Sequence, residues 1–351
     1  MPRWMFVVAA LAFCAPLFAQ QAPTAAEMAF IYELNRARSD PQQYDTDNSL
    51  GGILNGVAAQ PPLAINLYLV QSSRFHSAEM AANGYFAHQS AVTGDWPNKM
   101  ARDAGYTLPT SWTNTNNYIE SIAVIGTSGS SITYSPAAAL KALIVDAGVP
   151  SLGHRKHLLA MDSWNQAFRE IGTGYAEGIG WTGGINAAAY WAIHTGRHDT
   201  DPVWLTGVVY NDTNSNGRYD QGEGLSGVTV SATGPSSLNT VTTTGGGWSI
   251  AASAGAWNLT CNGGSFSGTA TASVTLSSAN VEVDFESGTA AGEVGFGNQL
   301  PNPPGGSSGG GKDKGSGGGC VAGESGSPAL WLLLVGLGGI ALSVPLRMRK
   351  E

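Results

Sequence analysis

The sequence GHRKHLL at residues 153–159 decides the fold of the N-terminal half, together with GYFAHQS at 84–90, NYIESIA at 117–123 and EIGTGY at 170–175. Apolar spacing and end signals predict helices around these stretches, and short apolar runs between turn residues predict strands. The expected helices are 25–38, 63–83, 97–104, 136–147 and 154–161, and the expected strands are 171–175 and 187–194. Helices and strands mix within one unit, so the fold class is α+β.

The order of these motifs resembles that of the CAP superfamily, the SCP-like proteins. An Asn-x-x-Arg opening at Asn35–Arg38 precedes the four stretches, and the resemblance covers residues 20–201. It implies an α-β-α sandwich with a cleft lined by two histidines and acidic residues. Carried over, the histidines are His88 and His154, and the first acid is Glu120.

Two features of this sequence depart from the family pattern. Ser121 stands where an Asn usually follows the first acid, and Asp146 is the one acid between Glu120 and His154. Asp146 is the weaker cleft candidate, because it lies only eight residues before His154.

The chemistry of such a cleft has two alternatives. His88 and His154 can bind Zn²⁺ or another divalent ion, with Glu120 supplying a ligand or orienting a ring. Alternatively, the carboxylate tunes a histidine as a base. His76 is interpreted as a packing residue, His157 as a helix-end charge, and His194 as a strand residue outside the cleft.

The pattern changes after Pro202. Short Val-, Thr- and Ser-rich runs divided by Gly or Asn predict an all-β sandwich over residues 202–298. Within it, residues 212–223 fit the twelve-residue calcium loop, in which Gly217 makes the turn. The predicted Ca²⁺ ligands are Asp212, Asn214, Asn216, Arg218 through its carbonyl, Asp220 and Glu223.

The loop and its flanking strands resemble the SdrD B-like repeats of bacterial surface proteins. That resemblance implies a calcium-stiffened spacer that holds the first domain away from a membrane. A polar hairpin loop without metal is the alternative interpretation of residues 212–223.

Both ends of the chain carry targeting features. Residues 1–19 combine Arg3, an apolar run and a small residue, which is typical of a signal peptide. Residues 299–328 form a Gly/Ser-rich linker that contains Cys320, and residues 329–351 predict a hydrophobic helix with a basic tail. This end is either a permanent transmembrane anchor or, by resemblance to Cys-containing C-terminal sorting signals, a segment that is cleaved near Cys320.

The bulk composition narrows the function classes. The net charge is −8, so the chain lacks the basic surface that nucleic acids require. We expect an extracellular, surface- or membrane-anchored protein whose cleft binds a lipid, cell-wall or other surface ligand. A metal-dependent or His/Glu-assisted hydrolase, peptidase-like, is the alternative, and residues 20–201 contain no hydrolase motif such as Gly-x-Ser-x-Gly to support it.

Overall fold

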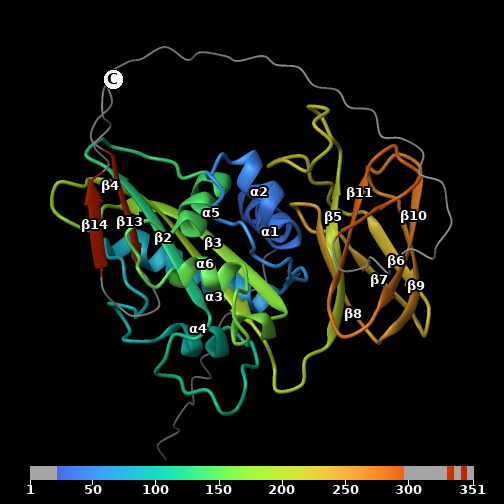
Figure 1. Ribbon diagram of the computed structural model, residues 1–351, viewed down its shortest axis with the longest axis horizontal. Helices are drawn as coiled ribbons and strands as arrows, with labels where there is room; N and C mark the ends of the chain where they lie inside the picture. The colour runs from blue at the N-terminus through green and yellow to red at the C-terminus, as the bar shows by residue number, and fades with distance from the viewer. Residues whose placement is uncertain (1–21, 296–329, 336–340, 346–351) are drawn as a thin grey trace, which may run out of the picture.

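The computed structural model describes residues 22–295, 330–335 and 341–345. These residues form a mixed α+β unit followed by a β-rich unit (Figure 1). The predicted signal peptide, the linker and Cys320 lie outside the described residues.

A single sheet organises the first unit. Its strand order is β1-β3-β4-β2-β13-β14, and only β1 and β3 run parallel. The strands are β1 Ala64–Ile65, β2 Glu120–Thr127, β3 Glu170–Ile179, β4 Ala187–Gly196, β13 Leu330–Val335 and β14 Ala341–Pro345.

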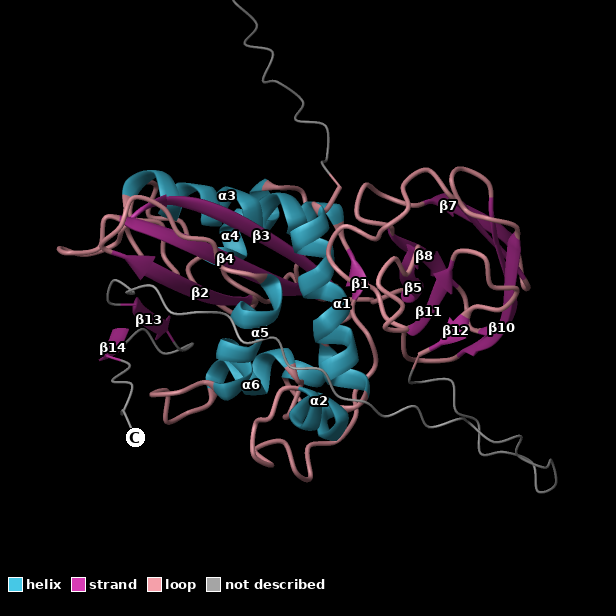
Figure 2. Cartoon of the chain, turned by 90° about the horizontal axis from the view of Figure 1, so that it is seen from above, coloured by secondary structure: helices cyan, strands magenta, loops and turns pink. Residues whose placement is uncertain are grey.

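Helices cover both faces of this sheet, as Figure 2 shows. They are α1 Ala25–Ser39, α2 Pro41–Asp47, α3 Leu67–Asn83, α4 Pro97–Asp103, α5 Pro136–Val145, α6 Gly153–Leu158 and the 3₁₀ turn Asn165–Ala167. Helices α3 and α4 lie over one face, and α5 and α6 lie over the other. Strands β2, β3 and β4 therefore lie between two helical layers.

Helix α3 begins later than the predicted 63–83 helix. Ala64 and Ile65 form β1, and the Asn66 side chain accepts hydrogen bonds from the amides of Tyr68 and Leu69. An N-cap of this kind fixes the first helical residue. Gly84, in the left-handed conformation, ends the helix.

The second unit consists of two four-stranded sheets with a shared apolar core. One sheet has the order β10-β9-β6-β7, and the other has the order β12-β11-β5-β8. The strands are β5 Val203–Tyr210, β6 Thr229–Thr233, β7 Ser237–Val241, β8 Gly247–Ala252, β9 Gly255–Asn262, β10 Thr269–Leu276, β11 Val281–Glu286 and β12 Glu293–Val294.

The two units meet at a buried junction rather than at a bare linker. The Asn35 side chain donates to Glu282 Oε1 at 3.2 Å and to the Leu63 carbonyl at 3.1 Å. The buried amide of Asn280 donates to the carbonyls of Pro62 and Arg169. These bonds satisfy buried polar groups of one unit with groups of the other, so the junction is specific.

The C-terminal apolar segment differs from its prediction. We expected a helix over 329–351, but residues 330–335 and 341–345 are antiparallel strands that continue the sheet from the edge of β2. A continuous apolar run fits a buried strand as well as a helix, and glycines such as Gly338 and Gly339 disfavour a helix interior. Across the described parts of the chain, no helix is both long and apolar enough to cross a bilayer.

Candidate functional site

Glu120 is the first residue of β2 and is completely buried. Asn117 fixes its backbone: the Asn117 side chain accepts from the Glu120 amide at 2.9 Å and donates to the Glu120 carbonyl at 3.1 Å. In the sheet register Glu120 pairs with His194 of β4. The strand pairing therefore places a carboxylate and an imidazole side by side in the core.

Three histidines surround this carboxylate. His88 Nδ1 lies 2.8 Å from Oε1, His194 Nε2 lies 2.9 Å from Oε2, and His76 Nδ1 also contacts Oε2. Burial alone would raise the pKa of Glu120, but the electrostatic influence of His76 and the hydrogen bonds from His194, His76 and His88 bring it well below its ordinary value. Glu120 is thus an ionised carboxylate that accepts from three rings.

His194 links Glu120 to helix α3. Its Nδ1 lies 2.7 Å from Ser72 Oγ, and its other ring nitrogen faces Glu120. Burial lowers the pKa of His194, although the bond to Glu120 acts in the opposite direction. The neutral ring therefore donates from Nε2 to Glu120 and accepts from Ser72 at Nδ1.

His154 has a carboxylate partner of its own. Its Nδ1 lies 2.7 Å from Asp146 Oδ1, and its backbone amide donates to Asp146 Oδ2 at 3.0 Å. Asp146 ends α5 in the left-handed conformation (φ 55°) and also accepts from the amide of Arg155. The short spacing that made Asp146 a weak candidate is what lets one carboxylate hold both the start of α6 and the His154 ring.

His157 completes the group of rings. Its two nitrogens each lie 2.7 Å from a hydroxyl oxygen, that of Ser121 and that of Thr195. Burial lowers its pKa to about 3, helped by the nearby charges of His154, Arg38, His194 and His88. His157 is therefore a neutral, fully hydrogen-bonded core residue and not the helix-end charge that we expected.

Three of these rings leave one nitrogen unused. His88 Nε2 and His154 Nε2 are buried and have no hydrogen-bond partner among the described residues, and the same holds for His76 Nε2. A ring that donates from Nδ1 to a carboxylate carries its free lone pair on Nε2 when it is neutral. This is the arrangement in which a carboxylate orients a histidine that binds a metal ion.

One cluster within the described residues brings three candidate metal-ligand atoms within 4.8 Å of one another: His76, Glu120 and His194. The set expected from the sequence, His88, Glu120 and His154, does not form such a cluster. Glu120 contacts His88, and His154 is bonded to Asp146 instead.

The sequence reasoning missed His76 and His194. Four of the six histidines of the chain, His76, His88, His157 and His194, bond to Glu120 or Ser121, and His154 lies close enough to His157 to affect its pKa. That concentration in one unit was the available signal. It could not be interpreted without the strand register that sets His194 opposite Glu120.

Residues 212–223, the predicted calcium loop, fold back on their own polar groups. Both Glu223 oxygens accept backbone amides, from Thr213 at 2.8 Å and from Asp220 at 2.9 Å. The side-chain amides of Asn214 and Asn216 both donate to one oxygen of Asp220. Their amide oxygens accept the backbone amides of Asn216 and Arg218, so Asn214, Asn216 and Asp220 lie next to one another in a closed hydrogen-bond network.

Asp212, Gly217 and Arg218 hold the backbone turn of this loop and its contact with the first unit. Asp212 accepts from the amides of Asn216 and Gly217, and Gly217 adopts the left-handed conformation (φ 75°) that position six of the template needs. The Arg218 guanidinium lies 3.0 Å from Asp47 of the first unit.

Comparison with known proteins gives no match. A scan against protein-family models finds no matching family, and a search of curated proteins finds no matching relative.

Proposed function

We propose that this protein is an exported, surface-held binding protein of CAP type, whose buried histidine centre binds a divalent ion such as Zn²⁺ through His88 and His154. One observation carries the proposal. Each ring has its Nδ1 fixed by a carboxylate, Glu120 or Asp146, while its Nε2 is buried without a partner. An unsatisfied buried polar atom costs about 1–3 kcal/mol, so each of these nitrogens favours a bound ligand, and His76 Nε2 is in the same position.

The remaining groups of the centre support two-histidine binding. His76 and His194 hold Glu120, and His157 is saturated by hydroxyls. An ion held by two imidazoles keeps open positions for water or for a donor atom of a bound ligand. When bound, such an ion would supply Lewis-acid chemistry, and the protein contributes rings whose orientation is fixed by Glu120 and Asp146.

The resemblances support the remaining parts of the proposal. The CAP-type motif order favours a ligand-binding domain at a cell surface, and the SdrD B-like loop favours Ca²⁺ in the second unit. The N-terminal leader favours export, and the Gly/Ser-rich linker with Cys320 favours attachment to a cell surface. Lipids and cell-wall components are the ligand classes that this setting favours.

Calorimetric titration of the full chain with Zn²⁺ tests the metal centre. We expect one saturable site in the wild type and its loss in His88→Ala and in His154→Ala. His198→Ala is the matched control, because His198 is the one histidine outside the centre and bonds instead to Glu170 and Thr107. Equal Zn²⁺ binding by all four proteins would rule out the proposed ligands.

A hydrolase is the second candidate, and Ser72 favours it. Ser72 Oγ, His194 and Glu120 form a continuous chain, and Ser72 also lines a cavity of about 180 Å³ with Phe75 and Met100. In this alternative Ser72 Oγ bonds to an acyl carbon while its proton passes to His194 Nδ1. The leaving group takes that proton, and water then releases the acyl group. A fluorophosphonate that adds covalently to the wild type but not to Ser72→Ala would support it, and an unlabelled Ser72 would remove it.

A further inference from the structure

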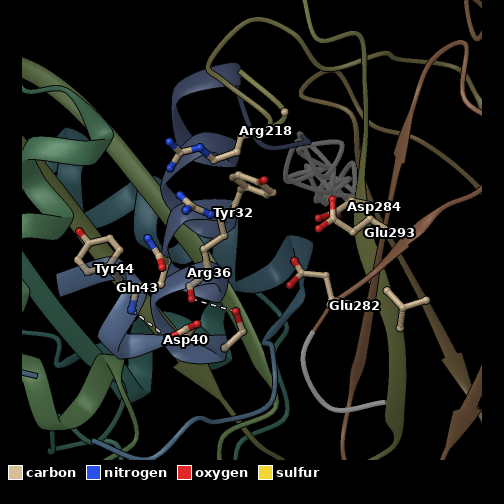
Figure 3. A pocket seen from close by; sticks show the side chains of 13 residues that line it. Tyr32, Arg36, Asp40, Gln43, Tyr44, Arg218, Glu282, Asp284 and Glu293 are labelled. Atoms are coloured by element: carbon tan, nitrogen blue, oxygen red, sulfur yellow. Dashed lines mark hydrogen bonds between the residues drawn. The ribbon is translucent and has the colours of Figure 1, made fainter. Parts of the chain in front are cut away.

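A cavity of about 340 Å³ lies at the junction of the two units (Figure 3). None of the described residues that line it is a histidine. One wall is formed by Glu282 and Asp284 of β11 and by Glu293 of β12. The opposite wall is formed by α1 and the calcium loop, which contribute Arg36 and Arg218. The volume is in the range of small-molecule pockets.

The acidic wall has no cationic partner. Glu282 is more than nine-tenths buried, and its one hydrogen-bond partner is the neutral Asn35 amide. No lysine, arginine or histidine nitrogen within the described parts of the chain forms an ion pair with Glu282, Asp284 or Glu293. Glu282 is the buried acid of the three, and Asp284 accepts the Val208 amide at 2.8 Å, so neutral donors hold this wall and it lacks a counter-charge.

The basic residues opposite cannot supply that charge. Arg36 is bonded to Glu33 and Asp47, and Arg218 is bonded to the same Asp47, each at about 3.0 Å. The charges of Arg36 and Arg218 are therefore already balanced, which disfavours an anion in the cavity. The negative charge of the acidic wall is left without a matching positive charge.

The pKa values of the wall agree with an uncompensated charge. Burial raises the pKa of Glu282 to about 7, and nearby Glu293 raises it further, while Asn35 and Arg36 act against the shift. Burial and the neighbouring Glu282 raise the pKa of Asp284 well above its ordinary value. An organic cation in the cavity would reverse both effects.

We infer that this cavity binds a small organic amine, with its ammonium groups against Glu282, Asp284 and Glu293. A bare metal ion is disfavoured, because these three carboxylates do not form a compact ligand cluster; the compact cluster within the described residues is that around Glu120. The rings of Tyr32 and Tyr44, which also line the cavity, favour an alkyl ammonium through cation–π contact.

Equilibrium titration of the full chain with 1,4-diaminobutane near pH 8 tests the inference. Saturable binding is expected, with affinity lowered at least about tenfold in Glu293→Gln and in Glu282→Gln. Glu286→Gln is the matched control, since Glu286 is on the same strand but does not line the cavity. Glu293 is exposed, so its variant keeps the test valid even if Glu282→Gln fails to fold.

Three further measurements complete the test. Affinity should fall between about pH 8 and pH 6, because a proton then competes for Glu282. Butan-1-ol should not bind, and His88→Ala should bind the diamine as the wild type does, which separates this site from the histidine centre. Absence of diamine binding, equal binding of butan-1-ol, displacement by millimolar Ca²⁺ alone, or unchanged binding in both cavity variants would overturn the inference.

Discussion

At the scale of single residues, the histidine centre depends on which nitrogen of each ring is occupied. Glu120 and Asp146 each take an Nδ1 proton, which directs the opposite nitrogens of His88 and His154 away from the carboxylates. Carboxylates in this position typically change metal affinity by about 10–100-fold when they are lost.

Asp146→Asn should therefore weaken Zn²⁺ binding by about 10–100-fold. The amide can accept from His154 Nδ1 with its single oxygen, but its NH₂ group would then face the backbone N–H of His154 and Arg155. Competition with a chromophoric chelator measures the change. Asp103→Asn, which alters an exposed partner of Lys99, should leave the affinity unchanged.

The acid stability of the chain should depend on His157. Its pKa is about 3 in the folded protein and about 6.5 when unfolded, so between these values the unfolded state binds more protons. Stability should therefore fall as pH decreases through this window, by roughly 1.4 kcal/mol per pH unit from this residue. Urea unfolding of His157→Gln between about pH 6.5 and 4 should show a shallower decline than the wild type. Parallel curves would assign the acid sensitivity to Glu120 and His194 instead.

At the scale of elements, the glycines of β3 decide how closely α3 approaches the sheet. A Cβ at Gly172 would lie 2.0 Å from the Val70 amide nitrogen, and one at Gly174 would lie 2.3 Å from the Arg74 amide nitrogen. The Ile-Gly-x-Gly motif is thus a contact surface for α3, the helix that presents Ser72 and His76 to the centre.

Gly174→Ala should lower the free energy of unfolding by about 3 kcal/mol, because the clash is with helix backbone that cannot rotate away. It should also reduce Zn²⁺ affinity by displacing α3. Thermal unfolding and titration of the same sample measure both effects. Gly183→Ala is the control, since a Cβ there meets nothing within 4 Å; equal stability of the two variants would contradict the close-packing account.

The elements also show how far sequence reasoning reaches. The strand predicted at 187–194 begins at its observed first residue, Ala187, and ends two residues early, because turn residues mark the start of the apolar run. The predicted 63–83 helix was too long at its start, because the capping role of Asn66 was not recognised. The partners of Glu120 were missed because they depend on strand register and on which face of α3 meets β3. Local periodicity of the sequence predicts neither the strand register nor the helix face that packs on the sheet.

At the scale of the whole molecule, the β-rich unit is joined to the first unit by shared core residues. Tyr219 of the predicted calcium loop is buried, and its ring packs edge-on against that of Tyr32 of α1, with 5.2 Å between the ring centroids. The backbone N–H of Tyr219 donates a hydrogen bond to the Tyr32 hydroxyl. The conformation of this loop therefore affects the packing of the junction between the two units. If the second unit is a spacer, a packed interface and not only the connecting chain holds the first unit to it.

Calcium should raise the melting temperature of the full chain through this loop. A site with a Kd near 10⁻⁴–10⁻³ M adds on the order of 1 kcal/mol at millimolar calcium. Differential scanning calorimetry in Ca²⁺ and in chelator should show the shift in the wild type and in Glu286→Gln. Glu223→Gln should not respond, because it loses a carboxylate oxygen of the loop. A wild type that melts alike in both buffers would reduce residues 212–223 to a polar hairpin loop.

The central claim is that His88 and His154 bind a divalent ion through their free nitrogens. X-ray absorption at the zinc edge of the full chain, loaded with one equivalent of Zn²⁺, tests it most directly. The account predicts scattering from two imidazole rings with oxygen in the remaining positions, and a loss of one ring in His154→Ala. A spectrum without imidazole scattering, or one that is identical in wild type and His154→Ala, would contradict it.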